Sequence, residues 1–70
     1  MNQFQIIGNN IRAARKQAQL GQIDLAEMVG IDRAYLSEIE NGHRNMTVGV
    51  LMAIADALKI RLPDIFSDAR

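Results

Sequence analysis

Residues 33–41 carry the side chains whose types and spacing best suit recognition chemistry. Helical periodicity predicts that Leu36 and Ile39 point inward. Four neighbours then point outward or sideways: Arg33, Ala34, Ser37 and Glu38. An arginine can donate two parallel hydrogen bonds to guanine O6 and N7, and a carboxylate can accept one from cytosine N4. These residues therefore predict an edge that reads base pairs, and ordinary solvated charge is the alternative.

Two members of this edge place conditions on the interpretation. Ala34 would contact a thymine methyl group or simply allow close approach. Glu38 would be repelled by phosphate groups unless it pairs with cytosine or with a neighbouring arginine. Asp32, which precedes the edge, is better explained as a helix N-cap than as a base contact.

A second group of residues is expected to contact the phosphate backbone: Gln22, Tyr35, Asn41, His43, Arg44 and Arg12. Gln22 opens a predicted helix, whose free N–H groups and dipole attract anions. Residues 43–45 form a polar loop after the helix stop at Asn41 and Gly42. Each residue has a simpler explanation as well. Gln22 and Arg12 would be exposed polar groups, and the Tyr35 ring would cover the edge of the core.

The sequence offers no grouping that suits catalysis or metal binding. The chain has no cysteine, and its single histidine, His43, has no further ligand at metal spacing. No nucleophile is paired with a base, and no glycine-rich phosphate loop is present. We therefore expect no enzyme, no metal and no cofactor, and we expect no cavity for a small-molecule ligand.

Five predicted helices position these residues. The first spans residues 1–19, with apolar residues on one face from Phe4 to Ala18, and contains Gly8, which only close packing would explain. Two short helices within residues 22–41 meet at Gly30, where a left-handed residue is needed. A fourth helix over 48–59 follows the N-cap Thr47, and a short last helix starts near Pro63. Residues 67–70 are expected to form a frayed tail.

Length and composition indicate one small domain over residues 1–70, with a formal net charge of zero. No signal peptide or membrane span is expected, so a cytoplasmic protein is predicted. Neutral charge counts mildly against nucleic-acid binding, although one face can still be basic. More apolar residues crowd the last third than one core needs, which predicts a homodimer interface. The candidate interface residues are Met52, Ile60, Leu62, Ile65 and Phe66.

Residues 22–41 resemble the DNA-binding helix-turn-helix, with a small residue fifth, glycine ninth and apolar residues at the fourth, eighth, tenth, fifteenth and eighteenth places. Over residues 7–66 the chain resembles the lambda-repressor-like, Cro/C1-type regulators of the XRE family. The segments that carry this resemblance are IGNNIRAARKQAQLGQIDLAEMVGI, DRAYLSEIENGHRN and LMAIADALKI. The segment GIDRAYLSEIENGHRNMT is also similar to the controller proteins of restriction–modification systems. Two positions depart from the family pattern. The family often has Ser or Thr where Gly21 stands, and Pro where Met46 stands.

The resemblance implies an all-α domain of five helices that regulates transcription as a homodimer. It implies reading of a near-palindromic, double-stranded DNA operator in the major groove, with base contacts from Arg33, Ala34 and Glu38. It also implies an internal ion pair between Arg15 and Glu40. Repression would follow from occupying a promoter, and activation would need contact with RNA polymerase. The alternative is a protein-interaction module, such as an antitoxin-type or adaptor subunit, that uses the apolar C-terminal patch.

Overall fold

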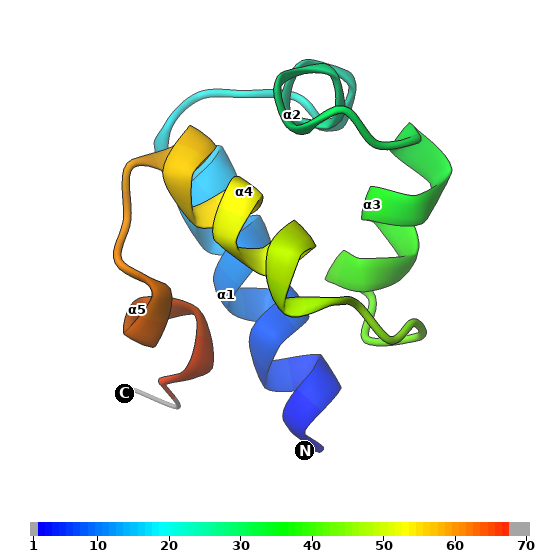
Figure 1. Cartoon of the computed structure of the whole chain (residues 1–70), viewed down its shortest axis with the longest axis vertical. Coiled ribbons are helices and arrows are strands. Elements are labelled where there is room, and N and C mark those ends of the chain that lie inside the picture. Colours follow the sequence, from blue (N-terminus) through cyan, green and yellow to red (C-terminus); the bar gives the residue numbers. More distant parts are fainter. Residues whose placement is uncertain (1, 68–70) are drawn as a thin grey trace.

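A computed structural model describes residues 2–67, and in this part of the chain there are five α-helices and no strand. Their bounds are α1 Gln3–Gln17, α2 Gln22–Val29, α3 Arg33–Glu40, α4 Val48–Leu58 and α5 Leu62–Phe66. In Figure 1, α3 and α5 lie on opposite sides of the molecule, with α1 and α4 between them and α2 across one end. This arrangement confirms the all-α, five-helix fold class predicted from the sequence.

The helix ends follow from local capping chemistry. The Asn2 side chain accepts a hydrogen bond from the Gln5 backbone N at 2.9 Å, and the Gln5 side chain accepts one from Asn2 N at 3.0 Å. Gly30 ends α2 in the left-handed conformation, with φ of 83°. The Thr47 hydroxyl accepts from Val50 N at 3.1 Å and begins α4, as predicted. Asp32 occupies the N-cap position of α3, but its carboxylate makes no capping hydrogen bond.

The core lies where α1, α2, α3, α4 and α5 converge. Its fully buried apolar side chains are Ile11, Leu25, Leu36, Ile39, Ile54 and Ile65. The assignment of Ile65 to a dimer interface is therefore wrong, because its side chain is 0% exposed and fills the core of the single chain. Ile60 and Leu62 are half-buried against the same core. Phe4, expected on the core side of α1, is instead exposed.

Gly8 explains how closely α1 approaches α3. A Cβ atom at this position would lie 2.6 Å from the carbonyl oxygen of Glu40, which is far closer than side-chain carbons approach backbone oxygens. The backbone of Glu40 belongs to α3 and cannot move without moving the helix. The close packing proposed for Gly8 is therefore the reason that the position lacks a side chain.

Besides the packing of Ile65, one amide side chain ties helix α5 to the middle of α1. Asn10 Nδ2 donates to the carbonyl oxygens of Ile65 at 2.7 Å and Ser67 at 2.8 Å. These carbonyls at the end of a short helix would otherwise lack partners within the helix. The predicted helical Met1 and the predicted tail residues 68–70 lie outside the residues that the structure describes.

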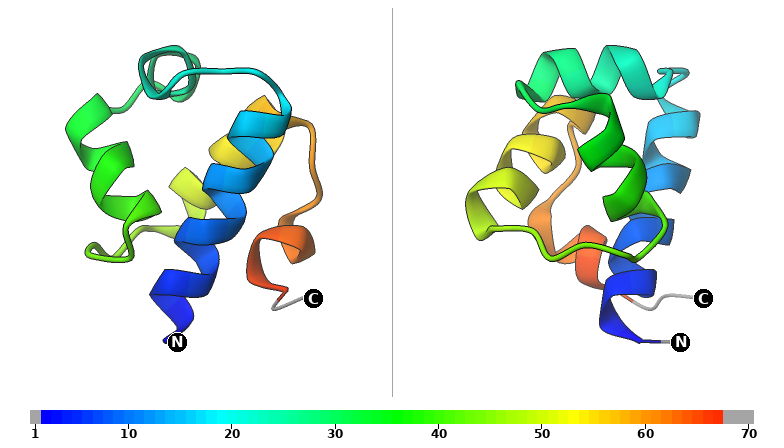
Figure 2. Two further views of the ribbon diagram at one scale, coloured as in Figure 1. Left: turned by 180° about the vertical axis from the view of Figure 1, so that it is seen from behind. Right: turned by 90° about the vertical axis from the view of Figure 1, so that its right-hand side faces the viewer.

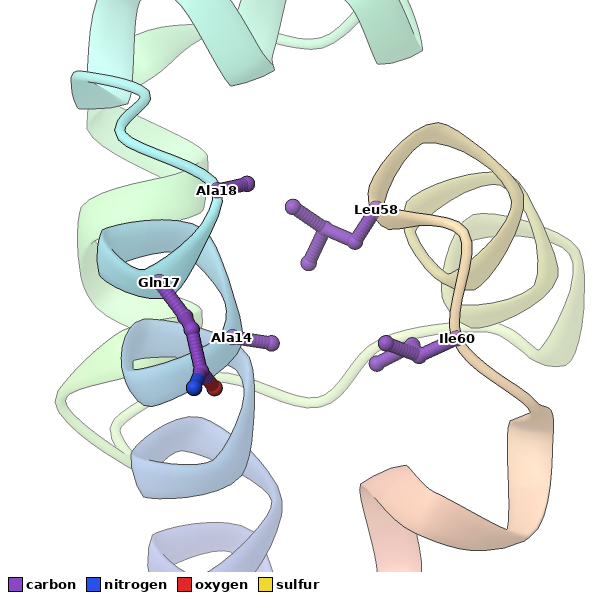
Figure 3. A pocket seen from close by; sticks show the side chains of 5 residues that line it. All are labelled: Ala14, Gln17, Ala18, Leu58 and Ile60. Atoms are coloured by element: carbon purple, nitrogen blue, oxygen red, sulfur yellow. The ribbon is translucent and has the colours of Figure 1, made fainter.

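A shallow hollow of about 230 Å³ lies between the C-terminal ends of α1 and α4. Figure 3 shows Ala14 and Ala18 facing Leu58 and Ile60 across it, with Gln17 at the side. The hollow is smaller than the ~300–1,000 Å³ of sites that hold drug-sized ligands. Among the helices of residues 2–67, none combines the length and apolar character that crossing a membrane requires.

Candidate nucleic-acid interface

A buried ion pair fixes α3 against α1. Arg15 Nε donates to Glu40 Oε2 at 2.7 Å, and Arg15 Nη2 donates to Glu40 Oε1 at 3.0 Å. Glu40 is 1% exposed and Arg15 is 8% exposed, so water scarcely reaches either group. This bidentate pair is the one that the family resemblance implied. It locks the inward side of α3 and so sets which residues face outward.

Two more side chains complete the surroundings of Glu40. Gln22 Nε2 donates to Glu40 Oε1 at 3.1 Å, so α2 is attached to the same carboxylate. Arg12 Nε lies 3.5 Å from Glu40 Oε1, and Arg12 Nη2 donates to Asn41 Oδ1 at 2.7 Å. No buried side-chain nitrogen or oxygen in residues 2–67 lacks a hydrogen-bond partner. The network therefore joins α1, α2 and the end of α3 through one acidic group.

Burial by itself would raise the pKa of Glu40, because it disfavours the charged form. Hydrogen bonds from Arg15, Gln22 and Arg12, together with the positive charge of Arg15, outweigh that burial and hold the pKa of Glu40 below its ordinary value. The hydrogen bond to Glu40 in turn raises the pKa of Arg15. Glu40 is consequently ionised whenever the domain is folded near neutral pH.

The opposite side of α3 is open to solvent. Arg33, Ala34 and Glu38 are exposed, and Ser37 is half-buried. Figure 2, in its right-hand view, shows α3 in front of the other helices, with α2 across its beginning. Arg33 Nη1 donates to Gln22 Oε1 at 3.4 Å, so the structure brings these two predicted contact residues together. The four residues predicted to read bases therefore lie on one solvent-facing side of one helix.

The loop after α3 turns back onto that edge. Gly42, with φ of 75°, reverses the chain, and Arg44 then forms an ion pair with Glu38. The guanidinium carbon of Arg44 lies 5.0 Å from the centroid of the Tyr35 ring, and the Tyr35 hydroxyl donates to Asn45 O at 3.4 Å. His43 is exposed, and residues 2–67 contain no group of three or more His, Asp or Glu side chains that could hold a metal ion.

Comparison with known proteins shows the family to which the chain belongs. The model of the family described as "Helix-turn-helix" matches residues 11–65. The chain belongs to the helix-turn-helix family. The matched range contains α2, α3, α4 and all the residues of the network around Glu40. The lambda-repressor-like, XRE-type resemblance seen in the sequence is thereby confirmed.

Regulators are among the relatives of this helix-turn-helix protein. The control protein C.MunI of Mycoplasma sp is 40% identical, with 97% of this chain and 95% of that protein covered. The immunity repressor protein of Bacillus phage phi105 is 37% identical over 89% of this chain, which spans only 43% of the phage protein. The crystal structure of the restriction–modification controller protein C.AhdI from Aeromonas hydrophila has a TM-score of 0.87 and 32% identity, covering 90% of this chain and 96% of that chain. The chain is accordingly a DNA-binding regulator by class, and these relatives are named as regulators rather than as enzymes.

Sequence reasoning missed two features of this surface, which are the identity of the arginine that pairs with Glu38 and the contact of that arginine with the Tyr35 ring. The pairing of Glu38 with Arg44 depends on the turn at Gly42, and Tyr35 serves as the platform under Arg44. The three-residue spacing of Tyr35 and Glu38 places them side by side on a helix, which is the signal that was available. The alternative that Glu38 pairs with a neighbouring arginine is the one found in the unbound protein.

Proposed function

We propose that this chain binds double-stranded DNA sequence-specifically, as a homodimer on a near-palindromic operator. The observation that carries the proposal is the exposed edge of α3, held in place from behind by the buried Arg15–Glu40 pair. A helix that presents polar side chains from a rigid support fits the major groove. Repression by occupying a promoter is the simplest regulatory outcome.

Each residue of the reading edge would make a different contact with the bases. Arg33 would donate to guanine O6 and N7, and Glu38 would accept from cytosine N4. Ala34 and Ser37 would approach the bases closely, the former against a thymine methyl group. Arg33 reaches Gln22 in the unbound protein through one 3.4 Å contact, which is long enough to be exchanged for a base.

The backbone contacts would come from the flanks of this edge. Tyr35 lies on α3 itself, Gln22 is at the start of α2, and His43 and Arg44 are in the loop that follows α3; all four would approach phosphate groups. Arg12 and Asn41 are hydrogen-bonded to each other, so a phosphate contact would have to compete with that bond. With a formal net charge of zero, the protein should make few phosphate contacts and show a shallow salt dependence.

A dimer would place two copies of α3 about one DNA turn apart, ~34 Å. Met52 is 56% exposed and Phe66 is 40% exposed, which supports their predicted place in the interface. Ile60 and Leu62 are half-buried and would add contacts at its edge. Sedimentation of the wild-type protein and of Met52→Glu tests this, since a charge in an apolar interface should shift the protein to monomer.

The decisive experiment is selection of bound duplexes from a random DNA pool, followed by affinity measurements on the selected site. Arg33→Ala should abolish specific binding. Arg61→Ala is the matched control, because Arg61 is also exposed but is the N-cap residue of α5, and α5 lies on the side of the molecule opposite α3 (Figure 1). Enrichment of a two-fold symmetric site supports the proposal. A folded protein that enriches no site, or equal binding by both variants, would contradict it.

The protein-interaction module is the second candidate, and the exposed apolar side chains of α4 favour it. Val48 is 63% exposed and Met52 is 56% exposed. In that role the chain would itself be an antitoxin-type or adaptor subunit that binds a different protein through its apolar C-terminal patch, and Arg33→Ala would leave partner binding intact. Contact with RNA polymerase and a cytoplasmic location remain predictions that depend on the DNA-binding role.

A further inference from the structure

Two residues that the proposed function assigns to DNA are bound to each other in the unbound protein. Glu38, expected to accept from a cytosine, forms an ion pair with Arg44, expected to contact a phosphate. A guanidinium that neutralises a carboxylate displaces no counterion from DNA. The paired carboxylate is also a weaker hydrogen-bond acceptor for a base. The ion pair therefore competes with both of these contacts.

We propose that the Glu38–Arg44 pair makes the phosphate contact of Arg44 conditional on the base that Glu38 meets. On a duplex with cytosine at that place, Glu38 accepts from N4 and releases Arg44, which then binds the adjacent phosphate. On any other base pair Glu38 keeps Arg44, and the phosphate contact is not made. This inference rests on the proposed function and makes Arg44 a specificity-determining residue without a base contact of its own.

Exposure makes this pair suited to exchange. The Glu38 side chain is 48% exposed and the Arg44 side chain is 54% exposed, so water screens their attraction. A pair of this kind favours the closed arrangement by no more than about fivefold. One hydrogen bond from cytosine and one phosphate contact are sufficient to compete with it.

Tyr35 keeps the freed guanidinium in place. Its ring lies under Arg44, 5.0 Å from the guanidinium carbon, and this contact does not involve Glu38. The Tyr35 hydroxyl also donates to Asn45 O, which ties the loop to α3. Arg44 therefore has a second support on α3 and stays near the DNA backbone after leaving Glu38.

Salt dependence measures the proposed exchange directly. Each phosphate neutralised steepens the slope of log K against log salt by about 0.9. The first step identifies the base pair that Glu38 reads. Duplexes are selected with the wild-type protein and with Glu38→Gln, and the position at which the preferred base differs between the two selections is that base pair. The wild-type protein is then titrated on the selected duplex and on one with only that pair replaced. The slope should be steeper on the selected duplex by about 0.9 per half-site, and Arg44→Gln should remove the difference.

A second measurement uses an arbitrary duplex. Glu38→Gln frees Arg44 permanently, so its slope should be steeper than that of the wild type by about 0.9 per half-site. Glu27→Gln is the matched control, since it removes one exposed carboxylate on α2 that has no ion pair among the residues described. The control should leave the slope unchanged. Circular dichroism confirms that these surface variants fold.

The outcomes separate the two proposals. Equal wild-type slopes on the two duplexes, or a difference that persists in Arg44→Gln, would overturn the conditional contact alone. The same holds if Glu27→Gln steepens the slope as much as Glu38→Gln does. A folded wild-type protein that binds no duplex would overturn the proposed function and this inference together.

Discussion

Two glutamates, two residues apart on α3, each hold an arginine in opposite surroundings. Glu40 points inward, is 1% exposed, and accepts from Arg15 and Gln22. Glu38 points outward, and its half-exposed side chain pairs with Arg44 from the following loop. The groups that interact are chemically the same in both cases.

Burial and the number of partners make these pairs behave differently. Glu40 joins three helices, so losing it leaves a buried arginine charge without its partner. The Glu38 pair joins one helix to a loop in water, where each member can find other partners. One pair is therefore suited to holding the reading helix and the other to responding to what that helix meets.

Removing the buried carboxylate should have the largest effect. We expect Glu40→Ala to lower the free energy of unfolding by about 3–5 kcal/mol, because Arg15 stays buried with its charge unpaired. Urea denaturation measures this loss. Glu27→Ala, at an exposed site, should change stability by less than about 0.5 kcal/mol. Equal stabilities of Glu40→Ala and Glu27→Ala would show that the buried pair contributes no more to stability than an exposed carboxylate does.

Crowding the contact behind Glu40 should come next. Gly8→Ala places a methyl group against the carbonyl oxygen of Glu40, and we expect a loss of about 1–3 kcal/mol. Gly49→Ala is the control, because its Cβ would have only Thr47 Oγ1 nearby, at 3.7 Å. There we expect a gain of about 0.4–1 kcal/mol. Thermal unfolding compares them, and a stabilised Gly8→Ala would show that α1 and α3 are not so closely packed.

Acid should weaken the buried pair more gently than mutation does. The folded pKa of Glu40 lies below its ordinary value of 4.5, so the unfolded chain binds more protons between the two values. The resulting stability is fully present above the ordinary value and is lost as pH falls through the folded pKa. As pH falls across this range, the free energy of unfolding should decrease less steeply in Glu40→Gln than in the wild-type protein. An NMR titration of the Glu40 carboxyl in the wild-type protein gives its folded pKa. Parallel curves would mean that Glu40 is not the group responsible.

Neutralising the exposed pair should have the smallest effect on folding. We expect Glu38→Gln to change the free energy of unfolding by less than about 1 kcal/mol, because the pair is solvated. The same urea measurement applies. A loss of unfolding free energy as large as that of Glu40→Ala would show that the exposed pair also supports α3. Such a strong pair would not open on DNA.

Features that depend on neighbours in the sequence could be predicted well. The left-handed turn at Gly30, the Thr47 cap and the outward placement of Arg33 all follow from local spacing. The Arg15–Glu40 pair joins residues that are 25 positions apart, and the family resemblance alone located it. Periodicity shows which side of a helix is apolar, but it does not show what that side meets.

The failures have this physical origin. Ile65 and Phe66 are adjacent apolar residues, and only the docking of α5 decides that the first is buried and the second exposed. Phe4 keeps the apolar spacing of α1 but lies exposed in its first turn. Gly8 weakens the predicted helix with no local benefit, because its benefit is a close approach to the backbone of Ile39 and Glu40, which are distant in the sequence. The Glu38–Arg44 pair likewise depends on how the loop folds back.

The amide of Asn10 has a consequence for when α5 forms during refolding and when it opens in the folded protein. Five residues are too few for α5 to persist as a helix alone, because nucleation is unfavourable and few internal hydrogen bonds repay it. Its carbonyls find their donor on α1, 55 and 57 residues away. The lifetime of α5 is therefore the lifetime of its docking. In hydrogen exchange, α5 should open as one unit, and it should form only after α1 is in place during refolding.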